Sequence, residues 1–187
     1  LTCIQIDPGT AFGTGAHETT QLCIRALNRY MKLMQAAGVC DIRVLDVGTG
    51  SGILGIAAKK LGAAEIFATD LDDNALEAVA ENLASNDLNP KDFTVVCGNL
   101  IDDPAVQAAA GEACYDIALA NILAPVILML EKEVWRHLKI GGIFITSGII
   151  DEKEEEVRAA IAANPHFEVL EVNRQGEWSS VVARRKA

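Results

Sequence analysis

The sequence lacks the features that would place the chain in a membrane, in an oxidising compartment or on a nucleic acid. No apolar run is long enough to cross a bilayer, and no signal-peptide pattern is present. The five cysteines are odd in number and have no close-paired spacing, which argues against a disulfide framework and a zinc site. Acidic residues outnumber basic ones by 26 to 16, and no local basic cluster could hold nucleic-acid phosphates. We therefore expect a cytoplasmic protein with reduced thiols, no metal, and no direct contact with nucleic acid or membrane.

Half of the 187 residues are hydrophobic, which is enough for one well-packed domain and hardly for two. The chain has no internal repeat, low-complexity tract or interdomain linker, and segments with strand and helix spacing alternate along it. This order predicts a single three-layer α/β domain over residues 1–187, which we expect to be a monomer. Strands are expected at residues 44–47, 66–70, 93–97, 115–120, 143–147, 167–172 and 178–183, and the last two should form a hairpin. Helices are expected around residues 23–34, 51–61, 72–83, 125–134 and 151–161, and the polar stretch 7–20 should be a loop.

A glycine-rich loop between the first strand and its helix is the centre of the predicted site. Gly50-Ser-Gly-Ile-Leu-Gly55 fits the fingerprint of dinucleotide-binding enzymes, which would make the protein an NAD-dependent oxidoreductase. Shifted along the chain, Asp46-Val-Gly48-Thr-Gly50-Ser-Gly52 fits the acidic-x-Gly-x-Gly-x-Gly pattern of S-adenosylmethionine-dependent methyltransferases. In either case the glycines let the backbone turn sharply and approach a ligand. The glycine pattern alone does not decide between the two enzymes.

Three features around the loop favour the methyltransferase. A carboxylate at Asp46 would repel a pyrophosphate, but it suits the sulfonium and ammonium groups of S-adenosylmethionine. Asn121 ends an expected strand, so its amide should face the same crevice as Gly48 and accept from a substrate amine or a cofactor group. A terminal hairpin on a parallel sheet is typical of methyltransferases and not of dinucleotide dehydrogenases.

Further polar residues follow the ends of other strands. Asp70, at the tip of the second strand, can accept both hydroxyls of a ribose. Asn99 follows the third strand and is either a contact for the exocyclic amine of adenine or a turn residue. His17 is expected to hold its loop by hydrogen bonds, and a role as general base is the alternative. His137 and His166 are expected at the surface.

Five motifs together make a resemblance to a known family specific. They are Asp7-Pro-Gly-Thr-Ala-Phe-Gly-Thr-Gly-Ala-His-Glu-Thr-Thr20, Leu45-Asp-Val-Gly-Thr-Gly-Ser-Gly-Ile-Leu54, Ala120-Asn-Ile-Leu123, Ser147-Gly-Ile149 and Gly176-Glu-Trp178. With these motifs, the chain resembles the PrmA family, whose members methylate the large-subunit ribosomal protein L-eleven. The resemblance implies a Rossmann-like class I methyltransferase fold with a seven-stranded, mostly parallel sheet, a C-terminal antiparallel hairpin and helices on both faces. It also implies S-adenosylmethionine as the cofactor and S-adenosylhomocysteine as its product.

The resemblance also implies roles for particular residues. The family's cofactor contacts fall on Thr20, Gly48, Asp70 and Asn121, and Thr20 could in addition cap the start of a helix. The family carries a small N-terminal substrate-recognition domain, and this chain begins where that domain should end, so we expect a catalytic-domain fragment or a naturally short relative. The expected site residues are Phe12, His17 and Asn121 at the reacting centre, and Thr20, Asp46, Gly48, Gly50, Gly52, Asp70, Asn99 and Asn121 at the cofactor.

The expected reaction is transfer of methyl groups to lysine side-chain amines, N-terminal α-amines or both on the ribosomal protein. Because the sulfonium leaving group becomes neutral, the main task of the enzyme is to align a neutral amine with the methyl group. We expect desolvation, and orientation by Asn121, to achieve this without a dedicated base. An amine on another protein or on a small molecule is an alternative substrate, because substrate choice lies outside these motifs.

Overall fold

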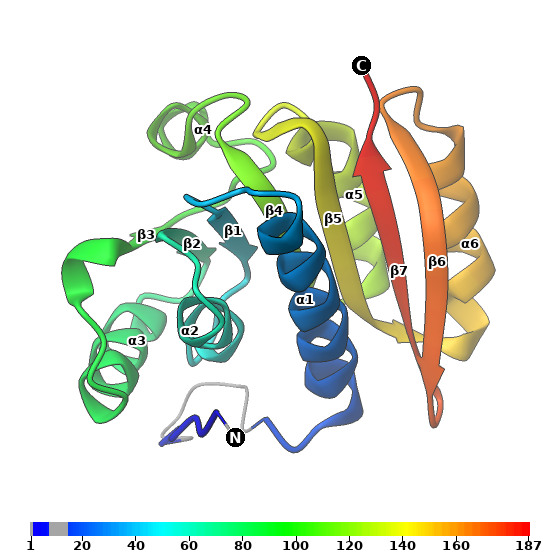
Figure 1. Cartoon of the computed structure of the whole chain (residues 1–187). Helices are drawn as coiled ribbons and strands as arrows, with labels where there is room; N and C mark the ends of the chain where they lie inside the picture. Colours follow the sequence, from blue (N-terminus) through cyan, green and yellow to red (C-terminus); the bar gives the residue numbers. More distant parts are fainter. Residues whose placement is uncertain (1, 8–14) are drawn as a thin grey trace.

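The computed structural model describes residues 2–7 and 15–187, and a seven-stranded sheet forms its centre (Figure 1). The strand order is β3-β2-β1-β4-β5-β7-β6. Strands β1 to β5 pair in parallel, whereas β7 is antiparallel to both of its neighbours, β5 and β6. The predicted mostly parallel sheet with a C-terminal hairpin is therefore confirmed. The strands are β1 (Arg43–Val47), β2 (Glu65–Asp70), β3 (Phe93–Cys97), β4 (Tyr115–Asn121), β5 (Leu138–Ile150), β6 (Phe167–Gln175) and β7 (Trp178–Arg185).

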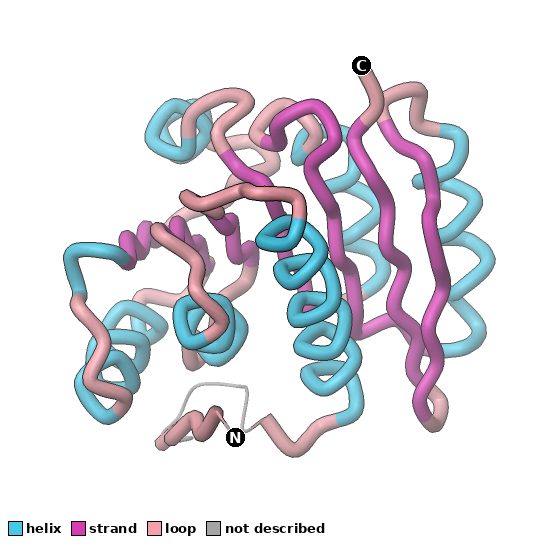
Figure 2. The backbone as a smooth tube through the Cα atoms, in the orientation of Figure 1, coloured by secondary structure: helices cyan, strands magenta, loops and turns pink. Residues whose placement is uncertain are grey.

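Helices cover both faces of the sheet, as Figure 2 shows in cyan beside the magenta strands. Successive strand residues point to opposite faces, so Val44 of β1 packs into one apolar cluster and Leu45 into the other. The first cluster is closed by α1, α2 and α3, and the second by α4, α5 and α6. The helices are α1 (Glu18–Ala36), α2 (Ile53–Lys60), α3 (Asn74–Ser85), the short 3₁₀ helix η1 (Pro90–Asp92), α4 (Pro104–Ala110), α5 (Ala124–Val134) and α6 (Asp151–Ala163).

The start of α1 differs from the prediction. The helix begins at Glu18, so the last three residues of the expected loop, 18–20, are its first turn. His17 is the N-cap: its Nδ1 atom accepts a hydrogen bond from the backbone amide of Thr19 at 3.3 Å. The prediction that Thr20 could cap this helix is therefore wrong. The apolar periodicity missed this turn because its buried residues, Thr19 and Thr20, are polar.

Two other expectations near β5 are corrected. The fifth strand was expected to begin at residue 143, but β5 already begins at Leu138 and runs through Gly141 and Gly142. His137 was expected at the surface and is only 3% exposed, because its Nδ1–H donates to the carbonyl oxygen of Gly111 at 2.6 Å. His166 is half-buried and stacks on Trp135, with ring centroids 3.5 Å apart.

No helix within residues 2–7 and 15–187 is long and apolar enough to cross a membrane. The same described ranges contain no group of three or more His, Cys, Asp or Glu side chains that could hold a metal ion.

Candidate active site

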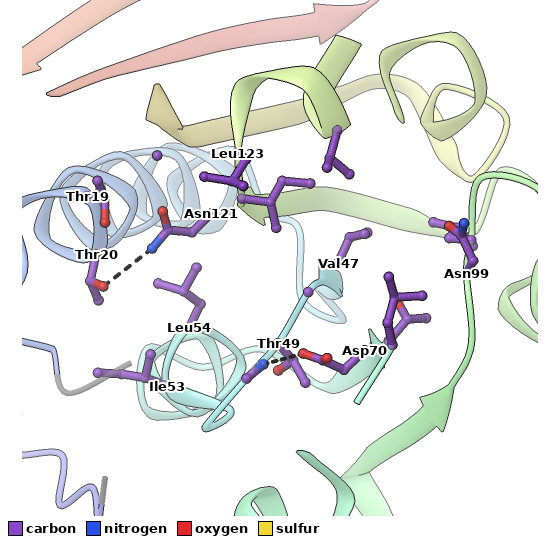
Figure 3. Close-up of a pocket in the computed structure, with 18 of the residues that line it drawn as sticks. Thr19, Thr20, Val47, Thr49, Ile53, Leu54, Asp70, Asn99, Asn121 and Leu123 are labelled. Atoms are coloured by element: carbon purple, nitrogen blue, oxygen red, sulfur yellow. Dashed lines mark hydrogen bonds between the residues drawn. The ribbon is translucent and has the colours of Figure 1, made fainter. Parts of the chain in front are cut away.

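A cavity of about 680 Å³ opens at the carboxyl ends of the parallel strands, and we call it the cleft. Its walls come from the first turn of α1, the loop after β1, the tips of β2, β3 and β4, residue 148 of β5 and the first residue of β7. Figure 3 shows Asn99 and Asp70 at one end of the cleft and Thr20 and Asn121 at the other. The predicted site residues that line it are His17, Thr20, Gly48, Gly50, Asp70, Asn99 and Asn121.

Two of the predicted site residues that the structure describes, Asp46 and Gly52, do not line the cleft. Asp46 is buried beneath the glycine loop, with 1% of its surface exposed. Gly52 is the N-cap of α2 and faces α3: a Cβ there would come within 3.0 Å of Val79 Cγ2. Phe12 lies outside the described residues.

The glycine loop lies against the tip of β2. The amides of Gly48 and Thr49 both donate to the carbonyl oxygen of Thr69, at 2.8 and 3.0 Å. Gly48 has a φ of +73°, and a Cβ there would come within 2.6 Å of Ile122 Cγ2. Only glycine fits both the backbone conformation and the space, so the backbone itself forms this wall of the cleft.

Asp70 is held by two backbone amides. Its Oδ2 atom accepts from the amide of Gly50 at 2.8 Å, and its Oδ1 atom accepts from the amide of Asp72 at 3.0 Å (Figure 3). Each carboxylate oxygen has lone pairs beyond the one used here, so the group can accept two further hydrogen bonds in a fixed orientation. This is the arrangement that a ribose diol requires.

Asn99 is a turn residue, one of the two roles that the sequence left open, and its position keeps the other role open. Its Oδ1 atom accepts from the backbone amide of Ile101 at 3.0 Å, which makes it a turn residue. The residue also lines the cleft at the Asp70 end, and the carbonyl oxygen has a second lone pair for an exocyclic amine.

Asn121 and Thr20 meet at the opposite end of the cleft. The amide nitrogen of Asn121 donates to the Oγ1 atom of Thr20 at 3.4 Å (Figure 3). The carbonyl oxygen of Asn121 is therefore the end that can accept from an amine, and it lies beside Gly148, where a Cβ would be 3.2 Å from it. In the parallel pairing of β4 with β5, Asn121 lies opposite Ser147, which places Gly148 next to the end of β4.

Trp178 is a residue of the cleft that sequence reasoning did not assign to the site. It lies at the start of β7, and its ring meets the His17 ring edge-on, with centroids 5.2 Å apart. The signal was present, because Gly176-Glu-Trp178 was one of the family motifs. The position of His17 as N-cap of α1, together with this ring contact, supports the loop-holding role.

Asp46 supports the loop from below. Its Oδ2 atom accepts from Thr49 Oγ1 at 2.7 Å and from the amide of Gly55 at 3.2 Å, while its Oδ1 atom is buried without a hydrogen-bond partner. Burial raises the pKa of Asp46 to about 6, the two hydrogen bonds act in the opposite direction, and the charge of Asp70 adds to the rise. The ordinary value of this pKa is 3.8.

This raised pKa predicts a stability that falls as the pH rises. Between about pH 4 and pH 6 the folded chain holds a proton on Asp46 that the unfolded chain has released, so the free energy of unfolding decreases with pH in that window. The shift corresponds to about 2–3 kcal/mol. Asp46→Asn keeps an acceptor for Thr49 and Gly55 but cannot titrate, so its stability should lack this decrease. Denaturant titrations of both proteins from pH 4 to pH 7 measure the difference, and parallel curves would contradict the assignment.

Comparison with known proteins assigns the chain to a protein family. Residues 2–186 match the model of a protein family described as ribosomal protein L11 methyltransferase (PrmA). The chain belongs to this family. Its membership decides between the two patterns of the glycine loop in favour of the methyltransferase pattern.

Two curated relatives and one solved structure support the same family. The chain is 51% identical over 183 residues to the ribosomal protein L11 methyltransferase of Lachnospira eligens and 50% identical over 182 residues to that of Agathobacter rectalis. These alignments cover 98% and 97% of this chain but 55% of each relative, so the chain spans about half the length of the curated relatives it matches. The crystal structure of ribosomal protein L11 methylase from Lactobacillus delbrueckii subsp. bulgaricus superimposes with a TM-score of 0.82 at 37% identity, covering 98% of this chain and 86% of that one. The fold is thus the Rossmann-like class I methyltransferase fold.

Proposed function

We propose that the cleft binds S-adenosylmethionine and that the chain is the catalytic domain of a methyltransferase acting on amines of ribosomal protein L11. One observation carries the proposal: a single cavity has an amide-fixed carboxylate, Asp70, at one end and the Thr20–Asn121 pair at the other. The family and its named relatives point to the same reaction. S-adenosylmethionine, when bound, supplies the methyl group.

The residues of the cleft fit this cofactor. Asp70 would accept from the ribose hydroxyls, and Asn99 from the exocyclic amine of the adenine. The half-buried backbone of Gly48 lines the cleft without a side chain, so a ligand can approach it closely. Asp46, whose Oδ1 atom is buried without a partner, places negative charge beneath the part of the cleft that would hold cationic groups.

The residues at the other end would prepare the amine. A lysine amine has a pKa of about 10.4 and an α-amine about 7.7–8.0, so both must lose a proton before they attack. The apolar side chains of Ile53, Leu123 and Trp178 line the cleft and would desolvate an amine there, which lowers its pKa. The Asn121 carbonyl oxygen would accept a hydrogen bond from the neutral amine and fix the direction of its lone pair.

The names of the relatives and the charge of the chain support a basic ribosomal protein as the substrate. Lysine-rich ribosomal proteins are basic, and a net charge of −10 on this chain would favour their approach. We propose that substrate recognition needs a further domain of the kind the family carries, and that the chain acts in the cytoplasm as a monomer without binding nucleic acid directly. An amine on a different protein is the second candidate, since the cleft itself selects an amine and not a particular protein.

Calorimetric titration of the chain with S-adenosylmethionine tests the proposal, with NAD as the matched control. Binding of S-adenosylmethionine alone is the expected result. Binding of NAD alone, or of neither compound to a chain shown by circular dichroism to be folded, would overturn the proposal. Incubation with purified ribosomal protein L11 and then with a lysine-rich control protein separates the two substrate candidates by mass spectrometry.

A further inference from the structure

The segment formed by residues 2–7 is docked along α3, although it belongs to no strand or helix (Figure 2). Its apolar side chains alternate with polar ones, and Ile4 and Ile6 pack against the first apolar cluster. Asn86, the C-cap of α3, binds both polar groups of the Gln5 backbone: its Oδ1 atom accepts from the amide at 2.9 Å and its Nδ2 donates to the carbonyl oxygen at 2.6 Å. Asn86 thus pairs with the segment as a neighbouring strand would.

Asn82 lies one turn earlier on the same face of α3 and holds two separate parts of the chain. Its Oδ1 atom accepts from the amide of Asp7 at 2.9 Å, and its Nδ2 donates to the carbonyl oxygen of Ser51 in the glycine loop at 2.9 Å. The side chain is only 1% exposed, so neither of its hydrogen bonds is replaced by water without cost. One buried amide therefore links residues 2–7 to the loop that forms the wall of the cleft.

The loop rests on α3 at a second point. Gly52 follows Ser51 and lies against Val79, which precedes Asn82 by one turn. The far side of the loop, residues 51 and 52, is therefore held by α3, while its near side, residues 48 and 50, faces the cleft. A shift of the Asn82 side chain therefore acts on the loop through its hydrogen bond to the Ser51 carbonyl oxygen, next to the contact between Gly52 and Val79.

We infer that Asn82 is a positioning residue of the cofactor loop that couples the docking of residues 2–7 to cofactor binding. The inference rests on the proposed function, because it names the cleft as the cofactor site. Docking of the segment orients the Asn82 amide, and the oriented amide holds the Ser51 carbonyl. By linkage, a ligand that requires the ordered loop must in turn tighten the docking of the segment.

Two substitutions separate the docking of residues 2–7 from the contact between Asn82 and the glycine loop. Asn86→Leu removes the contacts to Gln5, together with the hydrogen bond from Asn86 Nδ2 to the backbone carbonyl oxygen of Asn82, and leaves the Asn82 side chain and the loop in place. Asn82→Asp keeps an acceptor for the Asp7 amide but replaces the donor to Ser51 with a second oxygen. Asn89→Ala is the matched control, since exposed Asn89 only caps η1 with its side chain. Ile161→Val, in the second apolar cluster, controls for a general loss of stability.

The experiment combines hydrogen exchange of the Gln5 and Asp7 amides with calorimetric titration by S-adenosylhomocysteine. Asn86→Leu should speed exchange at Gln5 about tenfold and weaken S-adenosylhomocysteine binding about fivefold, a typical allosteric factor. Asn82→Asp should weaken binding by at least as much while Gln5 stays protected. S-adenosylhomocysteine should slow Gln5 exchange in the wild type and not in Asn82→Asp, which a merely structural role would not produce. The double variant should bind about as weakly as Asn82→Asp alone.

Each other outcome has a definite meaning. If Asn86→Leu binds S-adenosylhomocysteine as the wild type does, the coupling is overturned while the proposed function stands. If the losses of the single variants multiply in the double variant, the route through Asn82 is overturned. If the folded wild type binds no S-adenosylhomocysteine, the proposed function fails, and exchange at Gln5 in Asn86→Leu still reports whether the segment is docked as described.

Discussion

Replacing Asn121 with alanine is expected to lower kcat for methyl transfer about 100-fold, the cost of a misplaced reactant. The side chain is fixed by its hydrogen bond to Thr20 Oγ1 at 3.4 Å, and its carbonyl oxygen is the acceptor that would orient a neutral amine. Alanine removes this acceptor without opening the fold, because Asn121 lies at the end of β4 and lines the cleft. The affinity for S-adenosylhomocysteine, which shares the ribose and adenine contacts, should fall less than tenfold.

Single-turnover rates, with the cofactor saturating, measure this effect separately from binding. Asn173→Ala is the control: it makes the same chemical change on β6, where the side chain donates to Glu171 and does not line the cleft. A rate for Asn121→Ala within threefold of wild type would remove Asn121 from the reacting centre. If Asn121→Ala lowers only the affinity for the cofactor and not the rate, Asn121 contacts the cofactor but does not orient the amine.

Replacing Asp70 with alanine is expected to weaken S-adenosylmethionine binding about 100-fold while the fold is retained. The carboxylate is charged and fixed by the amides of Gly50 and Asp72, and charge-assisted hydrogen bonds of this kind contribute about 1.5–3 kcal/mol each. Removing the carboxylate also leaves the Gly50 amide without this hydrogen-bond partner. That amide lies at the cleft, where water can bind it. The thermal midpoint should therefore change much less than the affinity.

A change of ligand tests whether Asp70 contacts the ribose itself or only holds the glycine loop through Gly50. An S-adenosylhomocysteine analogue without the 2′-hydroxyl should bind wild type about tenfold more weakly than S-adenosylhomocysteine itself, a cost of about 1.4 kcal/mol for one hydrogen bond. Asp70→Ala should bind the two ligands equally. Asp41→Ala, an exposed carboxylate before the opposite end of β1, should behave as wild type. If Asp70→Ala discriminates between the ligands as strongly as wild type does, Asp70 does not hold the ribose.

The parts of the site that the sequence predicted are those built from contiguous residues. The strand, glycine loop and helix around Gly48, and Asp70 at the next strand tip, follow from apolar runs and from backbone rules that act over a few residues. The order of the sheet then brings Asn121 to the same edge. Sequence reasoning therefore located the cleft before any side-chain contact was known.

The parts that were missed depend on contacts between distant segments. Trp178 lies at the cleft because β7 pairs with β5, where it is opposite Ile150, and no local pattern encodes this pairing of separate segments. Asn82 reads as an ordinary polar residue on a helix, and only the approach of residues 7 and 51 gives it two partners. His137 was placed wrongly for the same reason, since its partner is the carbonyl of Gly111, 26 residues away.

The position of β7 in the sheet also sets the order in which the molecule can be assembled. Each of the strands β2 to β5 pairs with a strand that precedes it in the chain, so a growing polypeptide can add them to the sheet as it lengthens. Strand β6 cannot join, because its one neighbour, β7, follows it in the chain and lies between it and β5. Trp178 belongs to β7, so a nascent chain acquires the complete cleft only when β7 has been inserted between β5 and β6.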